Sequence, residues 1–156
     1  MILLPPDLRA ALRANTLARA DAYALRKAEP SNEARDSFDP IPVVKFFNPM
    51  GAATWIATEL DEDGDTLFGL ADLGFGCPEL GSFSLRELEA LRLPFGLRIE
   101  RDLTFEGMMP LSVWAGTAPH PIHIPRRSDD RRDRRRGPAP ASAALRWMTR
   151  GASRRN

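Results

Sequence analysis

Apolar residues recur at helical spacing near the start of the sequence. Leu8 and Leu12 lie one turn apart in an Ala-rich stretch, and Pro6 suits the first turn of a helix. The pattern predicts an α-helix from residue 6 to about residue 20. Residues 29–42 then carry several prolines and other turn-forming residues, which predicts a linker or an extended loop before the next element.

Strand patterns occupy the middle of the chain. Residues 43–47 are β-branched and aromatic, and residues 53–60 and 66–75 alternate in side-chain character. The alternation predicts two faces for residues 53–60. One face holds Thr54, Ile56, Thr58 and Leu60, and the other holds Trp55, Ala57 and Glu59. The second and third runs are expected to pair with each other.

An acidic stretch joins these two runs. Residues 61–65 hold four carboxylates and Gly64. Such a loop favours a β-hairpin, because glycine accepts a positive φ and aspartate side chains bind nearby backbone N–H groups. A calcium loop is the alternative, but it needs its glycine in sixth place and a glutamate in twelfth, where this sequence has Asp72. We therefore expect a solvated turn.

Residues 81–91 carry the clearest helix signal. Ser84 and Glu87 have the spacing of a capping box, in which the serine hydroxyl accepts from the Glu87 N–H and the carboxylate returns to the Ser84 N–H. The leucines expected on one face are Leu85, Leu88 and Leu91. With Pro94 beyond its end, the pattern predicts a short amphipathic helix of about two turns.

Residues 97–105 have the most regular alternation in the sequence. The apolar positions are Leu97, Ile99, Leu103 and Phe105. Arg101 falls on the apolar side, where an unpaired buried charge would be costly, so we expect an edge strand or a bulge; a binding role for Arg101 is the alternative. The predicted fold is α+β: an N-terminal helix, a mainly antiparallel sheet of about four or five strands, and a short capped helix before the last strand.

The charges divide the chain in two. Residues 1–115 carry 11 Lys and Arg against 18 Asp and Glu, a net charge of about −7, and residues 116–156 carry 11 Arg against 3 Asp, about +8. The second part is rich in Arg, Pro and Ala and lacks apolar periodicity. We expect one compact domain over residues 1–115 and a disordered tail over residues 116–156.

Composition also bears on the compartment. No apolar run approaches the roughly 18 residues that a membrane-spanning helix needs, and residues 1–10 lack the layout of a secretory signal. The single cysteine, Cys77, is compatible with a reducing compartment. We expect a cytoplasmic protein without membrane contact.

Few residues offer catalytic or metal-binding chemistry. Both histidines, His120 and His123, fall in the predicted tail, so the predicted domain holds no Ser-His-Asp or Cys-His set and no zinc pattern. Phosphate-binding glycine motifs are absent. We expect no cofactor and no bound metal; an enzyme that uses acidic residues of the sheet face stays open as the alternative.

Several consecutive motifs resemble one uncharacterised bacterial family. They are VVKFFNP, GAATWIATELD, FGLADLGFGCPELG, FSLRELEALR and GLRIERDLTF, and the likeness covers roughly residues 1–115. The chain is similar to the family catalogued as domain of unknown function 2958, which recurs on plasmids and other mobile elements. The resemblance implies an accessory role in a mobile element, and the family brings no catalytic residues with it.

Two kinds of partner are consistent with the charges. An arginine-rich tail can neutralise nucleic-acid phosphates, through Arg126, Arg127, Arg131, Arg132, Arg134, Arg135 and Arg136. The acidic domain can bind a basic protein instead. Strand parity suggests four binding residues on the polar side of the sheet, namely Arg101, Glu59, Asp72 and Trp55. We therefore predict a non-catalytic interaction protein.

Overall fold

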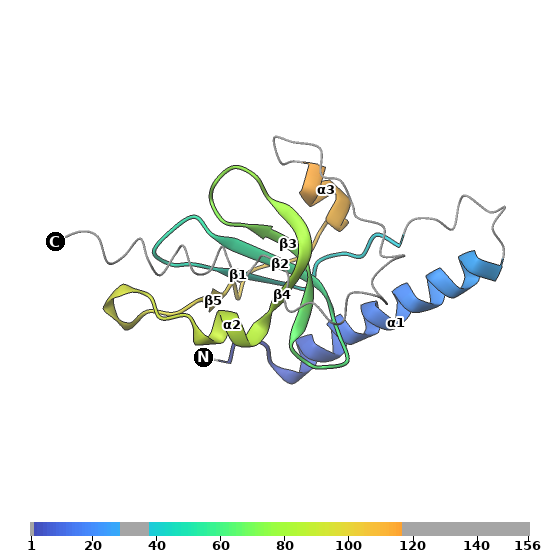
Figure 1. Ribbon diagram of the computed structural model, residues 1–156, viewed down its shortest axis with the longest axis horizontal. Coiled ribbons are helices and arrows are strands. Elements are labelled where there is room, and N and C mark those ends of the chain that lie inside the picture. The colour runs from blue at the N-terminus through green and yellow to red at the C-terminus, as the bar shows by residue number, and fades with distance from the viewer. Residues whose placement is uncertain (1, 29–37, 117–156) are drawn as a thin grey trace, which may run out of the picture.

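The computed structural model describes residues 2–28 and 38–116 (Figure 1). The elements in order are α1 (Pro6–Ala28), β1 (Val44–Phe47), β2 (Thr54–Leu60), β3 (Thr66–Asp72), β4 (Glu79–Ser84), α2 (Leu85–Ala90), the 3-10 turn η2 (Pro94–Gly96), β5 (Glu100–Arg101) and α3 (Leu111–Gly116). The predictions for the tail, including the seven arginines named as nucleic-acid contacts and both histidines, lie outside the described residues.

The five strands form one antiparallel sheet in the order β4-β3-β2-β1-β5. This confirms the α+β class, with α2 preceding the last strand. β4 was not predicted, because glycine, proline and serine around it indicate a loop. Pairing with β3 makes it a strand, from Thr66 opposite Ser84 to Ala71 opposite Glu79.

The main core lies on one face of the sheet. It is built from the N-terminal residues, α1, α2 and inward strand residues, including Leu4, Leu12, Phe46, Trp55, Leu67, Leu85 and Leu88. The opposite face holds a smaller cluster in which Ile56 and Leu70 pack with Leu111 and Ala115 of α3. In Figure 1 α3 lies above the strands, and α1 and α2 lie below them.

A bulge in β2 changes which residues face the main core. The register with β3 shifts between Ala57 and Glu59, so Thr58 is an extra residue. The predicted parity is therefore wrong beyond this point. Leu60 joins Trp55 in the main core, whereas Glu59 lies across from Phe68 on the opposite face. A sequence pattern of period two cannot reveal one inserted residue.

Helix α1 takes the place of a strand beside the end of β2. β1 pairs only with residues 54–57, which leaves the backbone of residues 58–60 open on that side. Asn15 Nδ2 donates to the Thr58 carbonyl (2.9 Å), and the Thr16 hydroxyl donates to the Leu60 carbonyl (2.8 Å) and accepts from its N–H (3.2 Å). Side chains of α1 thus satisfy buried backbone groups that would otherwise be costly.

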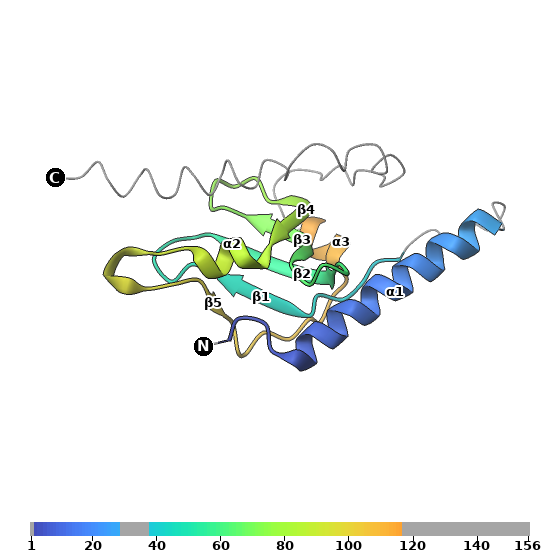
Figure 2. The ribbon, with the colours of Figure 1, turned by 60° about the horizontal axis from the view of Figure 1, so that its bottom comes forward.

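α1 is longer than predicted, ending at residue 28 rather than near residue 20. Its later residues are Ala-rich, and alanine has the highest helix propensity. The apolar periodicity ends near the last contact with the sheet, so periodicity alone predicts a helix that is too short. Figures 1 and 2 show this end of the helix projecting beyond the strands.

The predicted strand over residues 97–105 is reduced to Glu100–Arg101 at the sheet edge. The edge position agrees with the expectation for Arg101. The strand stops because the Asp102 carboxylate accepts from the Thr104 N–H (3.0 Å) and hydroxyl (2.8 Å), which turns the chain. Leu103 is consequently exposed, and its predicted inward position is wrong.

Removing the Thr16 hydroxyl tests the contact between α1 and β2. Thr16→Val keeps the side-chain shape but leaves the Leu60 backbone without its partner, so we expect the free energy of unfolding to fall by about 1–3 kcal/mol in urea denaturation. Thr54→Val is the matched control, since the Thr54 hydroxyl makes only a long, exposed contact with the Ala52 carbonyl. Equal losses in the two variants would contradict the assignment.

Candidate functional site

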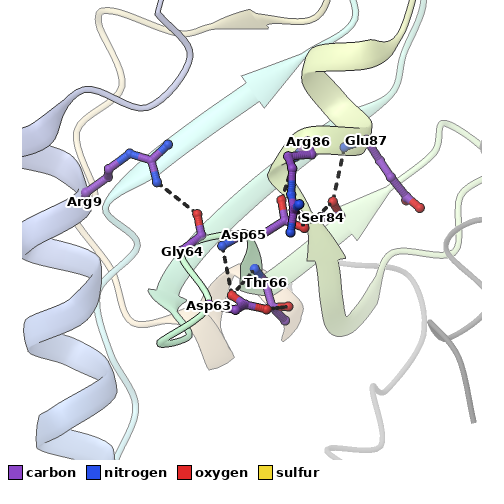
Figure 3. Close-up of polar contacts among 8 residues, drawn as sticks. All are labelled: Arg9, Asp63, Gly64, Asp65, Thr66, Ser84, Arg86 and Glu87. Atoms are coloured by element: carbon purple, nitrogen blue, oxygen red, sulfur yellow. Dashed lines mark hydrogen bonds and ion pairs between the residues drawn. The ribbon is translucent and has the colours of Figure 1, made fainter. Parts of the chain in front are cut away.

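The acidic loop between β2 and β3 is a hairpin turn, as predicted (Figure 3). Gly64 has a φ of 69°, and its N–H donates to the Asp61 carbonyl (3.0 Å). The Asp63 carboxylate accepts from the Asp65 N–H (2.9 Å), the Thr66 N–H (2.8 Å) and the Thr66 hydroxyl (2.6 Å). The aspartate thus organises the turn instead of presenting free ligand oxygens.

The last aspartate of the turn, Asp65, binds the start of α2. Its carboxylate accepts from the Arg86 N–H (2.8 Å) and the Ser84 hydroxyl (2.9 Å) and pairs with Arg86 Nε (3.1 Å). Ser84 accepts from the Glu87 N–H (3.1 Å), so that half of the predicted capping box is confirmed. Figure 3 shows the Glu87 side chain extending outward, with Asp65 occupying the other side of the cap.

Helix α1 also contacts this turn. Arg9 Nη1 donates to the Gly64 carbonyl (2.9 Å), and Arg13 Nη2 donates to the Glu62 carbonyl (2.8 Å). Two arginines near four carboxylates reduce the local negative charge. The acidic loop is therefore a junction between α1 and α2 rather than an isolated acidic tip.

Glu59 is the most buried charged residue of the described chain, with 2% of its surface exposed. Arg19 Nη2 lies 2.7 Å from Glu59 Oε1, and the Arg19 guanidinium carbon lies 4.7 Å from the centre of the Phe68 ring and 5.8 Å from that of Phe38. The ion pair and the two aromatic rings stabilise the charges of Arg19 and Glu59 in a site that is largely shielded from water.

A small pocket opens beside this ion pair. It is lined by Thr16, Glu59, Asp61, Thr66, Phe68 and Ser82 and has room of about 10 Å³. A volume of this size holds about one water molecule. The pocket is too small for an organic substrate, so Glu59 cannot reach one without rearrangement of the surrounding side chains.

The four binding residues suggested by strand parity do not share one polar face. Trp55 lies in the main core, 1% exposed, so it offers no stacking surface. Arg101 is in the same cross-strand row, separated from Trp55 by Phe46, and its Nε is buried without a hydrogen-bond partner among the described residues. Glu59 and Asp72 face the other side. The structure therefore corrects the parity argument, which placed all four residues on the polar side of the sheet.

Asp72 has a local role at the end of β3. Its carboxylate accepts from the Gly74 N–H (2.8 Å), which starts the loop towards β4. Asp72 lies opposite Thr54 in the register, away from the Glu59 pocket. A binding role for Asp72 or Arg101 stays a prediction.

Three loops lie at one end of the sheet, here called the loop end: residues 48–53, 73–78 and 92–98. The register places them there, because Phe47 pairs with both Thr54 and Glu100, and Thr54 pairs with Asp72. The second and third loops belong to opposite edges of the sheet, with the first between them. Figures 1 and 2 show the three loops on the side opposite the projecting end of α1.

Each loop of the loop end exposes a large apolar side chain. Phe75 is 78% exposed, Phe95 is 90% exposed and Met50 is about half exposed. Sequence reasoning missed these residues. Their signal was a large apolar residue between turn formers, in NPMG, GFG and PFG, because a turn leaves such a side chain without a core to enter.

One family model matches most of the chain. A family model described as "Protein of unknown function (DUF2958)" matches residues 3–124. The chain belongs to this family. The resemblance expected from the sequence motifs is thereby confirmed. No curated protein and no solved structure matches the chain.

The described part of this DUF2958 chain contains neither a metal-binding cluster nor a membrane-spanning helix. Within residues 2–28 and 38–116, no group of three His, Cys, Asp or Glu side chains is placed to hold a metal ion. Among the helices described, none has both the length and the apolar character needed to cross a membrane.

Breaking the buried ion pair tests whether it supports the fold. Arg19→Met removes an ion-pair partner of the buried Glu59 carboxylate. We expect it to lower the free energy of unfolding by about 1–3 kcal/mol, with part of the loss recovered in Arg19→Met/Glu59→Gln. Lys45→Met is the control, because Lys45 pairs with Asp102 (3.2 Å) in a more exposed position and should cost less than about 1 kcal/mol. Additive effects of the Arg19 and Glu59 substitutions would show that the two side chains are not coupled.

The hairpin turn should make stability depend on pH. Burial alone would raise the pKa of Asp63, but hydrogen bonds from the Thr66 side chain and the Thr66 and Asp65 backbone outweigh it and hold the pKa below its ordinary value of 3.8. The ionised form therefore stabilises the fold above pH 3.8, and this contribution is lost as pH falls through the lowered pKa.

Urea midpoints between pH 7 and pH 2 measure this contribution. We expect Asp63→Asn to be less stable than the natural chain at pH 7 and to lose less further stability on acidification. Glu62→Gln removes the same charge from an exposed neighbour and should leave the acid dependence nearly unchanged. An acid dependence that is the same in Asp63→Asn and the natural chain would refute the assignment.

Proposed function

We propose that this DUF2958 chain is a non-catalytic accessory protein that binds a protein partner through the loop end. The observation that carries the proposal is the exposure of Phe75 and Phe95, two aromatic side chains on loops that the sheet register brings to the same end. Exposed aromatic residues on a monomer are typical of interaction sites and supply most of the binding energy when a partner buries them.

The backbone at Phe95 supports a functional reason for this residue. Phe95 has a φ of 60° and is the only described residue other than glycine with a positive φ. A bulky side chain in this region costs about 1–3 kcal/mol, and asparagine or glycine would fit better. The backbone of residue 95 is strained, and its ring is 90% exposed, so the ring gives the fold nothing in return. A partner that buries the ring accounts for both features.

The loops of the loop end are held in place, which favours tight binding. A Cβ added at Gly74 would lie 2.7 Å from the Ala52 Cβ, so the first two loops are in close contact. Asn48 accepts from the Met50 N–H (2.8 Å), and the Leu93 N–H donates to the Leu97 carbonyl (3.0 Å). Ordered loops lose less conformational entropy on binding.

The charged residues that flank Phe75 and Phe95 indicate what kind of surface the partner presents. Asp72 and Glu79 flank Phe75, whereas Arg92 and Arg98 flank Phe95. A lipid surface or a nucleic acid would favour one sign of charge throughout. A protein with an apolar patch between a basic and an acidic rim fits this arrangement better.

The enzyme alternative has less support. Glu59, the acidic residue best placed for acid–base chemistry, is paired with Arg19 beside a pocket of about 10 Å³. The bacterial, mobile-element and cytoplasmic setting is part of our proposal and rests on the sequence motifs and composition. Contact of the Arg-rich tail with nucleic acid is compatible with it and could bring the bound partner to a nucleic acid.

Substitution at the loop end tests the proposal. The full-length chain and a Phe75→Ser/Phe95→Asn variant are compared by quantitative co-purification from the native cell, followed by titration of the protein that the natural chain retains. We expect the variant to bind at least about tenfold more weakly, as for the loss of two central aromatic contacts. Its stability should be unchanged or higher, since asparagine tolerates the backbone of residue 95.

Leu103→Ser is the matched control. Leu103 is similarly exposed but lies beyond β5, away from the loop end. It should bind like the natural chain. Equal binding by the natural chain and the Phe75→Ser/Phe95→Asn variant would reject the loop end as the interaction surface.

A further inference from the structure

The outer face of α1 is a second surface that the fold leaves uncovered. Residues Leu8, Leu12, Asn15, Thr16 and Arg19 face the sheet through the contacts described above. On the opposite side of the helix, Leu17 is 66% exposed and Leu25 is 54% exposed. Between and around them lie exposed alanines, namely Ala10, Ala14, Ala18, Ala24 and Ala28.

α1 is longer than the part of it that contacts the sheet, so its outer face extends beyond the sheet. The helix has 23 residues, equivalent to about 34 Å, whereas its last polar contact described with the sheet is at Arg19. Figures 1 and 2 show the C-terminal end projecting past the strands. A short helix without packing is marginal in water, so a projecting end with exposed leucine gains from a helical partner.

The charges on this face are self-complementary about Leu17. Arg13 precedes Leu17 by four residues and Asp21 follows it by four; Asp7 precedes it by ten and Lys27 follows it by ten. All four residues are exposed. In an antiparallel pair of identical helices centred on Leu17, each acidic residue lies at the level of a basic residue of the other helix.

We propose that α1 pairs antiparallel with α1 of a second copy of this chain, with Leu17 of both copies at the two-fold axis. The alanines allow the helices to approach closely, and the leucines fill the seam. Of these four charged residues two are acidic and two are basic, so the outer faces of two copies do not repel each other. This inference is independent of the loop end, which lies at the other end of the molecule (Figure 2).

A single helix-to-helix contact is small compared with permanent dimer interfaces, which bury more than about 2,000 Å². The dimer should therefore be weak and reversible. Sedimentation velocity of the full-length chain from about 1 to 300 μM should show a concentration-dependent change from monomer to dimer. A natural chain that remains monomeric throughout overturns the proposal and leaves this face to a different protein.

Substitutions distinguish this pairing from other contacts. Leu17→Glu places two carboxylates at the two-fold axis, and we expect at least a tenfold weaker dimer. Tyr23→Glu is the control, because Tyr23 is exposed but lies about 120° around the helix from Leu17. It should dimerise like the natural chain, and equal weakening by both substitutions overturns the assigned face.

Charge exchange tests the antiparallel register. Arg13→Asp and Asp21→Arg should each weaken the dimer, since each places like charges at the same level. The double variant Arg13→Asp/Asp21→Arg should recover most of the affinity, although Arg13 also donates to the Glu62 carbonyl. Circular dichroism and urea midpoints confirm that each variant is folded. A folded double variant no better than either single variant overturns the register.

Discussion

The hydrogen bonds between α1 and the end of β2 determine how the rest of this fold is arranged. β2 continues beyond its pairing with β1, so the backbone of residues 58–60 lies inside the protein with no strand on that side. Asn15 and Thr16 supply the missing donors and acceptor. With α1 held there, Arg19 lies one turn later against Glu59, and Arg9 and Arg13 reach the hairpin turn. A helix in the place of a strand also leaves its outer face to solvent.

This arrangement separates residues that hold the fold from residues that can bind. The carboxylates that were candidates for catalysis or metal binding have structural roles instead. Glu59 pairs with Arg19, Asp63 organises the turn, and Asp65 caps α2. Apolar side chains, by contrast, are exposed on three loops at the opposite end and along α1. Our account of function therefore rests on exposed apolar surfaces of known position rather than on acidic residues, and both proposed interfaces leave the core unchanged.

Local signals predicted local structure well. The Ser84 cap, the hairpin at Gly64 and the edge position of Arg101 depend on neighbouring residues and were expected from sequence. Non-local features were missed. β4 becomes a strand only because β3 lies beside it, and the bulge at Thr58 reverses the parity on which the proposed roles of Trp55 and Glu59 depended. The loop end needed the sheet register, since no pattern along the chain relates Phe75 to Phe95.

Native-state hydrogen exchange at the Leu60 amide tests the role of α1 most directly. This N–H donates to a side chain of a helix, not to a neighbouring strand. Our account predicts that it exchanges only when the whole domain unfolds, with an exchange free energy equal to the free energy of unfolding from urea. Exchange of Leu60 as fast as that of the exposed Glu62 amide would show that α1 does not close this edge of β2, and would contradict the account.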